Sequence, residues 1–155
     1  MSHDSAPVAI SNLRANDETA IGAIVGTFFD AFTSGPDIRA RMDALRAVFL
    51  PGAVIVRTCG LEPAVYDVES FIEPRYALLT GDTLTDFSEW ELSGHTEVFG
   101  DIAHHFCSYA KAWTQDGAKF TGRGMKTIQF IRTADGWRIS AAAWDDERDG
   151  LVLPD

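Results

Sequence analysis

The stretch that decides the fold is DIAHHFCSYAKAWTQDGAKFTGRGMKTIQFIRTADGWRISAAAWDD, from Asp101 to Asp146. Polar and apolar residues alternate along it, and Asp-Gly turn signals interrupt the alternation at residues 116–117 and 135–136. A similar run begins at Thr83 and ends at a turn near Gly100. This period of two predicts a meander of four long antiparallel strands, at about residues 85–98, 101–115, 119–133 and 137–146.

The residues before this region follow a helical period instead. Apolar side chains recur every three or four positions from Ile21 to Phe32, and acidic residues near Asn16 predict the start of that helix. Helices before an antiparallel sheet predict an α+β fold in which the helices cover one sheet face. The other predicted elements are helices at about residues 38–49 and 67–79, the latter broken or restarted at Pro74, and a short strand at residues 53–57.

Length and composition indicate one globular domain. The chain has 155 residues, of which 46% are hydrophobic and 23% charged, and this is ordinary for a single packed core. We expect a flexible arm over residues 1–14, one domain over residues 15–150 and a tail over residues 151–155 whose apolar side chains dock on a surface.

The charge balance bears on the partners. The chain carries 13 Lys and Arg against 23 Asp and Glu, a net charge of −10, which disfavours nucleic acid and anionic membrane surfaces. No apolar run approaches the ~18 residues of a membrane span, and the first residues do not resemble a signal peptide. We therefore expect a cytoplasmic protein in which Cys59 and Cys107 stay reduced.

Three segments of the C-terminal half resemble a known family. They are Gly122–Phe130 (GRGMKTIQF), Asp135–Ile139 (DGWRI) and Trp144–Glu147 (WDDE). Together with the order of the predicted elements, they are similar to uncharacterised SnoaL-like members of the nuclear transport factor 2-like superfamily, over about residues 17–147. The resemblance implies a cone-shaped, curved antiparallel sheet of the cystatin-like type, wrapped around N-terminal helices.

The resemblance also implies a range of activities. The superfamily includes ketosteroid isomerases, scytalone dehydratases, polyketide cyclases, epoxide hydrolases and non-catalytic transport and assembly domains. Our first hypothesis is a cofactor-free enzyme that applies acid–base chemistry to a hydrophobic ring or carbonyl compound, as an isomerase, dehydratase or cyclase. The alternative is a ligand-binding or dimeric assembly domain without catalysis, because fold alone does not separate the two.

Strand register decides which polar residues share the cone. If both Asp-Gly turns are three-residue loops, one sheet face lines a cavity beside the first and third predicted helices, with small Ala141 and Ala143 leaving room. Two-residue loops would shift the pairing and separate these residues. The pairs predicted from three-residue loops are Tyr109 with Arg123, His105 with Thr127, Gln129 with Ala141, and Met125 with Asp145.

Two residues on this predicted face are candidates for catalysis. His105 is either a general acid or base, since histidine titrates near neutral pH, or a histidine held by a neighbouring group. Asp145 is either a carboxylate base or half of an ion pair with Arg123 or Arg148. The candidate ligand-binding residues are Phe28, Phe32, His95, Tyr109, Arg123, Met125, Thr127 and Gln129.

The opposite face is predicted to be apolar. Such a face is unsuited to water, so we expect a homodimer joined through the convex side of the sheet. His104 and His105 point to opposite faces of a regular strand and cannot bind the same metal, and we predict neither a metal nor a cofactor. The residues predicted on the convex face are His104, Phe106, Ile128, Phe130, Ala142 and Trp144.

Overall fold

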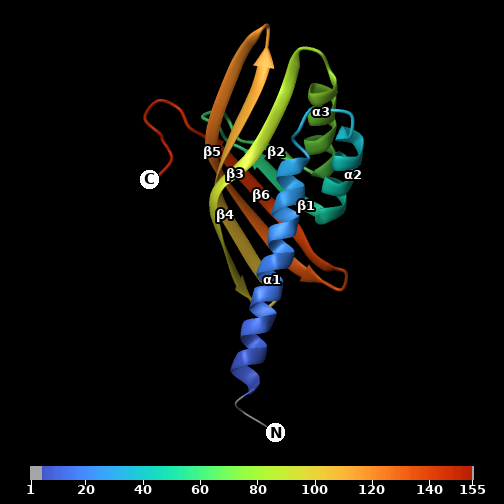
Figure 1. The fold of residues 1–155 in the computed structure, drawn as a ribbon, viewed down its shortest axis with the longest axis vertical. Helices are drawn as coiled ribbons and strands as arrows, with labels where there is room; N and C mark the ends of the chain where they lie inside the picture. The colour runs from blue at the N-terminus through green and yellow to red at the C-terminus, as the bar shows by residue number, and fades with distance from the viewer. Residues whose placement is uncertain (1–4, 155) are drawn as a thin grey trace.

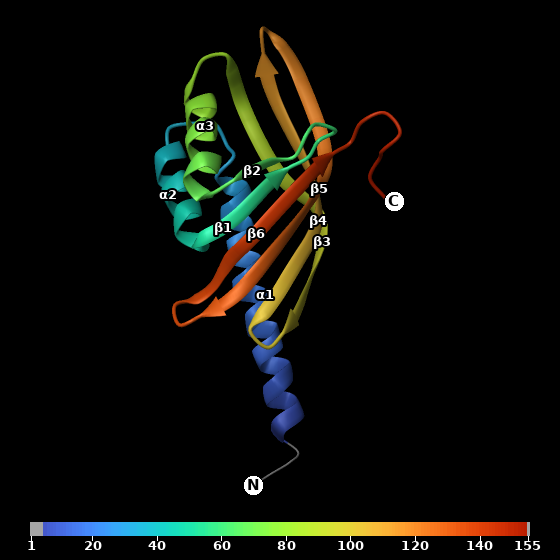
Figure 2. The same ribbon diagram turned by 180° about the vertical axis from the view of Figure 1, so that it is seen from behind.

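Helices cover one face of a curved sheet (Figures 1 and 2). The computed structural model describes residues 5–154, and within that range three helices and six strands form an α+β fold, which confirms the predicted fold class. In chain order the elements are α1 (Ser5–Asp30), α2 (Ile38–Val48), β1 (Phe49–Arg57), β2 (Ala64–Tyr66), α3 (Val68–Thr80), β3 (Leu84–Phe99), β4 (Ile102–Gln115), β5 (Ala118–Thr133) and β6 (Gly136–Asp146).

The six strands form one sheet in the order β2-β1-β6-β5-β4-β3. Strands β3 to β6 are the predicted antiparallel meander. The sheet is mixed rather than wholly antiparallel, because β1 runs parallel to β6. The short β2, which the sequence analysis did not predict, pairs with β1 at the edge.

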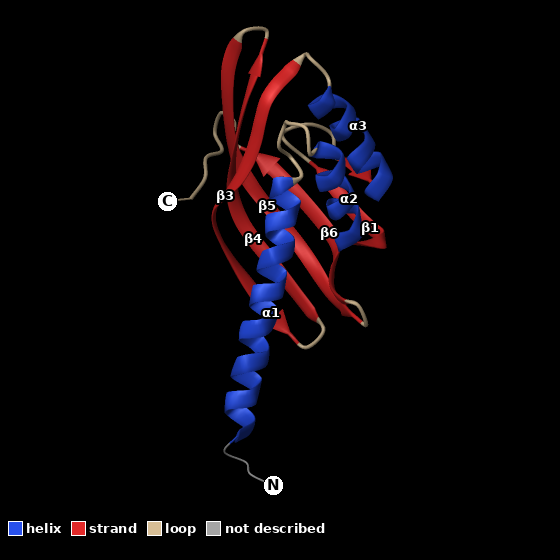
Figure 3. Ribbon diagram, turned by 45° about the vertical axis from the view of Figure 1, so that its right-hand side comes forward, coloured by secondary structure: helices blue, strands red, loops and turns tan. Residues whose placement is uncertain are grey.

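The C-terminal half of α1 lies along the inner face of the sheet, the face that is turned toward the helices, and the first turns of the helix extend beyond the sheet (Figure 3). Its predicted apolar stripe is confirmed, since Ile21, Val25 and Phe28 are at most 4% exposed. The helix begins at Ser5, earlier than the predicted start near Asn16. The acidic residues there do not cap the helix: Asp17 instead accepts hydrogen bonds from Arg132 and Trp137 and ties α1 to the sheet.

The described part of the tail, residues 151–154, lies outside the strands of the sheet. Residues 1–4 of the predicted arm and Asp155 of the predicted tail fall outside the described residues. In the tail, the amide of Leu153 donates a hydrogen bond to Glu147 Oε2 at 2.7 Å, while Val152 remains exposed.

Of the helices in residues 5–154, none is long and apolar enough to cross a membrane.

α3 packs beside α2 and brings its own side chains toward the sheet. A capping box starts it: the Ser70 amide donates to Asp67 Oδ1 at 2.8 Å, and the Asp67 amide donates to Ser70 Oγ at 3.0 Å. The helix continues through Pro74, so the predicted break is wrong. Burial of Phe71 in the preceding turn holds this segment against the core, and tertiary packing outweighs the helix-breaking tendency of proline.

The turn between β4 and β5 overturns the predicted register. Asp116 and Gly117 both have positive φ, 52° and 78°, as a two-residue type I′ loop requires. Gln115 therefore pairs with Ala118, and each β4 residue faces a partner one position later than predicted. The corrected pairs are Tyr109 with Gly124, Cys107 with Lys126, and His105 with Ile128.

The turn between β5 and β6 is also a two-residue loop, because Thr133 pairs with Gly136. A β-bulge between the Phe130 and Gln129 pairs absorbs the resulting shift. Beyond the bulge the strands return to the predicted register. The predicted pairs of Gln129 with Ala141 and of Met125 with Asp145 are therefore confirmed.

With these two registers, the polar residues that were predicted to share one face lie on opposite faces of the sheet. His105 and Tyr109 face the helices, whereas the polar residues predicted beside them on β5 and β6 lie on the outer face. The predicted convex face is wrong in the same way, because Ile128 and Phe130 are fully buried on the inner face. The inner face also carries Cys107, Lys126, Ala142 and Trp144, and the outer face carries Phe106, Arg123, Met125, Thr127, Gln129, Ala141, Ala143 and Asp145.

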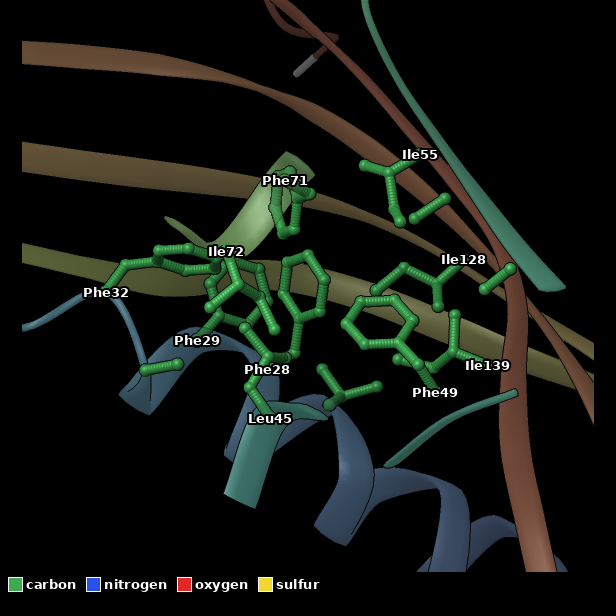
Figure 4. Packing of buried hydrophobic residues seen from close by; sticks show 14 of the residues in the cluster. Phe28, Phe29, Phe32, Leu45, Phe49, Ile55, Phe71, Ile72, Ile128 and Ile139 are labelled. Atoms are coloured by element: carbon green, nitrogen blue, oxygen red, sulfur yellow. The ribbon is translucent and has the colours of Figure 1, made fainter. Parts of the chain in front are cut away.

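Aromatic and aliphatic side chains fill the space between the helices and the sheet (Figure 4). The ring of Phe28 lies 6.3 Å from that of Phe49 and 6.4 Å from that of Phe71, measured between centroids. Aromatic packing of this kind contributes beyond the area it buries. Phe32 and Phe71 form the edge of this cluster that borders a cavity.

Candidate functional site

A cavity of about 190 Å³ lies between α3, the loop that follows α1 and the inner face of the meander. Its wall is mostly apolar, with a few polar groups that converge on it, as is typical of small-molecule sites. The apolar lining residues are Phe32, Phe71, Leu78, Leu79, Phe87 and Trp144. The polar lining residues are Arg75, Glu89, Tyr109, Lys111 and Lys126.

Lys126 and Glu89 form a buried ion pair in this wall. Lys126 Nζ lies 2.9 Å from Glu89 Oε1, and the two side chains are 7% and 8% exposed. Glu89 Oε1 is itself buried, and apart from the Lys126 ammonium no described group lies within hydrogen-bond reach of it. Removing two charges from water is costly and contributes little net stability, so a buried pair in a cavity wall points to binding or catalysis.

Aromatic rings surround the Lys126 ammonium. Its Nζ lies 4.1 Å from the centroid of the Tyr109 ring and 5.0 Å from that of Trp144. The faces of these rings attract a cation, and this attraction partly replaces the lost hydration. The charge is thereby held at a defined point of the cavity wall.

A second polar group joins Tyr109, Lys111 and Asp146. The Tyr109 hydroxyl donates a hydrogen bond to Asp146 Oδ1, and Lys111 Nζ donates to Asp146 Oδ2 at 2.9 Å. Burial and the bond to Asp146 raise the pKa of Tyr109, so the phenol stays protonated. Burial opposes ionisation of Asp146, but the hydrogen bonds from Tyr109 and Lys111 outweigh it and lower the pKa of that carboxyl. Asp146 is therefore the counter-ion of Lys111.

Gly124 allows the contact between Tyr109 and Asp146. It lies opposite Tyr109 in the β4–β5 register. A β-carbon at this position would overlap the backbone oxygen of Asp145 and come within 2.9 Å of Tyr109 Cε1 and 2.8 Å of Asp146 Oδ1. Glycine is thus required here by close approach rather than by backbone conformation.

Arg75 reaches the cavity from α3. Its guanidinium carbon lies 4.2 Å from the centroid of the Phe71 ring and 5.2 Å from that of Trp144. One NH1 proton is donated to the carbonyl oxygen of Phe71 at 2.9 Å, and Arg75 makes no ion pair with any residue in the described part of the chain. Burial lowers the pKa of Arg75, and the smaller effect of the Arg57 charge acts in the same direction, whereas Tyr66 and the charge of Glu89 raise that pKa.

The predicted site residues are spread over three places. Phe32 and Tyr109 line the cavity, and Phe28 lies behind it, with its ring 5.5 Å from Lys126 Nζ. His105 is buried on the inner face away from the cavity lining. The register that grouped the others with the cavity is wrong: His95, Arg123, Met125, Thr127, Gln129 and Asp145 lie on the outer face.

The charged residues among the latter form surface ion pairs. Asp145 pairs with Arg148 and not with Arg123, and the hydrogen bond from Arg148 lowers the pKa of the Asp145 carboxyl. Arg123 pairs with Glu147 at 3.0 Å. Of the two readings of Asp145, the geometry matches the ion pair.

Within the part of the chain that the structure describes, two clusters hold side chains of the kind that bind metals. They are Glu91 with His105 and Cys107, and His95 with Glu97 and His104. In the first, His105 Nε2 contacts Glu91 and Nδ1 lies 2.8 Å from Thr96 Oγ1. Burial raises the pKa of the Cys107 thiol to about 12, so the thiol is protonated at neutral pH and a metal would have to displace its proton. These are the residues that could hold a metal.

Four charged residues that line the cavity were not among the residues predicted from the sequence. Alternation along a strand separates two faces but does not tell which face is turned inward, and charged residues are normally on the outside. The one available signal was the Asp116-Gly117 turn: as a two-residue loop it places Lys126 opposite Cys107, on the inner face. The missed residues are Arg75, Glu89, Lys111 and Lys126.

Comparison with known proteins supports the fold. No protein-family model and no curated protein sequence matches the chain. Among solved structures, it is similar to an NTF2-like protein with a cystatin-like fold from Novosphingobium aromaticivorans, with a TM-score of 0.71 and 16% identity over 97% of this chain and 94% of that one. It is also similar to an NTF2-like superfamily protein from Salmonella enterica serovar Typhimurium, with a TM-score of 0.72 and 12% identity over 90% and 96% of the two chains.

A third similar structure is a ketosteroid isomerase-like protein from Erwinia carotovora atroseptica, with a TM-score of 0.60 and 17% identity over 85% and 97% of the two chains. The chain therefore has the nuclear transport factor 2-like fold, which confirms the predicted resemblance at the level of fold. At these identities the likeness concerns fold alone, and any activity has to be argued from the cavity.

Proposed function

We propose that the cavity is the active site of a cofactor-free enzyme that moves a proton on a small hydrophobic carbonyl compound. Glu89 is the base, and Lys126 is the group that stabilises the developing oxyanion. The observation that carries this proposal is the buried Lys126–Glu89 ion pair in an aromatic wall. It places a proton acceptor and a hydrogen-bond donor side by side, as proton abstraction next to a carbonyl requires.

The reaction proceeds without a change of oxidation state. The Glu89 carboxylate takes a proton from the carbon next to the substrate carbonyl, and the electron pair of the broken C–H bond moves toward oxygen to give an enolate. The Lys126 ammonium donates a hydrogen bond to that oxygen. Glu89 then returns the proton to the same or another carbon, so that the net reaction is exchange or isomerisation.

The surroundings favour this chemistry. Phe32, Phe71, Phe87 and Trp144 make the wall apolar, and a fixed charge acts more strongly on a developing enolate beside an apolar wall than in bulk water. Tyr109 is a positioning residue, because its ring lies under the Lys126 ammonium while its hydroxyl is fixed by Asp146. The scheme does not use the roles predicted for His105 and Asp145, neither of which lines the cavity.

The size of the cavity limits the substrate. An apolar cavity of ~150 Å³ holds a benzene molecule. A volume of about 190 Å³ therefore suits one six-membered ring with a short substituent. Phenylacetone, a ring that bears a short ketone with acidic α-protons, is a suitable probe.

The test is hydrogen–deuterium exchange at the α-carbon of phenylacetone in D2O, followed by proton NMR. We expect the protein to accelerate exchange over buffer and Glu89→Gln to reduce that acceleration by about 100-fold or more. Glu97→Gln is the matched control, because Glu97 is an exposed carboxylate on the same strand. Acceleration that survives in a folded Glu89→Gln variant would remove the proposal.

A non-catalytic binding domain is the second candidate. It is favoured by the dense aromatic core, which fills the space beside α1 with side chains such as Phe28 and Phe49. Saturable binding of phenylacetone without any acceleration of exchange is the result expected from this alternative.

A further inference from the structure

We infer that the ligand of this cavity is a single-ring hydrophobic acid whose carboxylate binds Arg75. The inference rests on the proposed function in placing the substrate in the same cavity, and it specifies the chemical class of that substrate. A carbonyl group for Glu89 and Lys126 to act on and a carboxylate for Arg75 together describe a ring-bearing keto acid.

The charges in the cavity wall do not balance. The lining holds three cations and one carboxylate, Glu89. Lys126 is neutralised by Glu89 and Lys111 by Asp146, at 2.9 Å in each pair. Arg75 makes no ion pair with a described residue, so one positive charge remains for a ligand to neutralise. A half-buried cation without a counter-ion is costly unless an anion binds it.

The Arg75 side chain is held in place by its neighbours. Its guanidinium is packed against Phe71 and Trp144 and is fixed by its hydrogen bond to the Phe71 carbonyl, so little conformational freedom remains to be lost on binding. A planar guanidinium matches a carboxylate through two parallel hydrogen bonds. Arg75 is therefore preorganised for a carboxylate.

A second guanidinium lies nearby. The charge of Arg57 contributes to the lowered pKa of Arg75. Arg57 NH2 donates to the carbonyl oxygen of Glu62, while its buried Nε has no hydrogen-bond partner in the part of the chain that the structure describes. The Arg57 Nε is therefore a second hydrogen-bond donor near Arg75 that no described residue satisfies.

The excess of basic residues in the cavity lining contrasts with the acidic composition of the whole chain. The chain has a net charge of −10, and acidic residues outnumber basic ones by 23 to 13. A random choice of charged residues would give a cavity with an acidic excess. The cavity lining instead holds three basic residues and one acidic residue, and this favours an anionic ligand over a neutral one.

The positions of the two cations relative to Trp144 suggest how the ligand lies. Arg75 Cζ is 5.2 Å and Lys126 Nζ is 5.0 Å from the centroid of the Trp144 ring. A ring stacked near the indole can direct one polar substituent to each cation. A ring-bearing keto acid such as phenylpyruvate has this arrangement of groups.

Equilibrium binding tests the inference apart from catalysis. The probes are phenylacetate and its neutral isostere phenylacetamide, measured by isothermal titration calorimetry with the full chain at pH 7.5. We expect phenylacetate to bind about tenfold or more tightly than phenylacetamide, as hydrogen bonds to a charged partner imply. Arg75→Gln should remove that preference and leave phenylacetamide binding within about threefold of the native value.

Control variants keep the experiment decisive. Arg39→Gln removes another guanidinium that stacks on a ring, 4.9 Å from that of Tyr76 but outside the cavity lining, and it should change neither affinity. If Arg75→Gln does not fold, Arg75→Lys, which keeps the charge and loses the planar fork, should weaken phenylacetate binding by at least about threefold. Equal affinity for the two probes, or binding of neither up to about 10 mM, overturns the inference.

The outcome separates this inference from the proposed function. Accelerated exchange of phenylacetone with no preference for phenylacetate would leave the enzyme proposal standing and remove the carboxylate. A preference for phenylacetate that depends on Arg75, with no exchange of phenylacetone or phenylpyruvate, would retain the acid-binding site and remove catalysis.

Discussion

The ammonium of Lys126 lies 2.9 Å from Oε1 of Glu89, and neither side chain is more than 8% exposed. The two residues come from strands that are not neighbours in the sheet, since β4 lies between β3 and β5. The ion pair therefore crosses over β4 on the inner face of the sheet and links β3 to β5. Each side chain is the counter-ion of the other, so removing one charge leaves the other charge buried without a partner.

Lys126→Met should lower the free energy of unfolding by about 3–5 kcal/mol, because it leaves the Glu89 carboxylate buried without a counter-ion. Chemical denaturation in urea measures the change. Adding Glu89→Leu to the same chain should recover most of the loss, since an apolar pair of similar volume replaces the charges. Lys119→Met on the exposed end of the same strand is the control, and its unfolding free energy should stay near the native value. A double variant no more stable than Lys126→Met would contradict this account.

Gly124→Ala should destabilise the protein by about 1–3 kcal/mol, because the added methyl group would overlap the backbone carbonyl of Asp145, the Tyr109 ring and the Asp146 carboxylate. Thermal or urea unfolding reports the change. Gly26→Ala is the matched control: Gly26 lies in α1 with open space around it, and alanine there should stabilise the helix by about 0.5–1 kcal/mol. Opposite signs for the two substitutions are the expected result, and equal effects would count against close packing at Gly124.

Asp146 should make stability depend on pH in the acid range. Its pKa is lower in the folded protein than the ordinary value of 3.8, so its contribution is fully present above about pH 4 and is lost as the pH falls through the folded value. Asp146→Asn should therefore lower the unfolding free energy at pH 7 and lose less on going to pH 3 than the native protein does. Urea unfolding at the two pH values measures both effects. The exposed Asp149→Asn serves as the control, and an unchanged pH slope in Asp146→Asn would disprove this role.

The predicted homodimer stays a prediction, but the residues that would form it have changed. Ile128 and Phe130 are fully buried on the inner face, and Trp144 lines the cavity. A substitution at any of these three positions would therefore not probe a dimer formed through the outer face. Phe106, Val54 and Ile102 are 43%, 45% and 54% exposed and are among the apolar groups available there.

We propose that two copies pair through this outer face. Sedimentation velocity at micromolar concentration should then show a dimer that Phe106→Glu converts to a monomer, while Leu61→Glu, at an exposed loop position, leaves it intact. A native chain that sediments as a monomer would exclude the pairing.

Periodicity determined the architecture. The change from a helical period to a period of two near Thr83 was enough to predict the helices, the four-stranded meander and, through the resemblance, the nuclear transport factor 2-like fold. These features repeat over many residues, so one misplaced turn does not alter them. The stripe from Ile21 to Phe32 was predicted correctly for the same reason.

The site depended on single-residue choices that only the tertiary structure made. Whether the Asp116-Gly117 loop has two residues or three decides whether Lys126 or Met125 faces the helices, because a one-residue slip exchanges the faces of a strand. A local bulge then restored the predicted pairing of Gln129 on the other side of β5. The partners of Lys126 and Arg75 come from distant elements, so no local pattern marks Glu89 as a counter-ion or Arg75 as an unpaired cation. The sequence by itself determined the cone, and the packing of its strands decided which charges lie inside it.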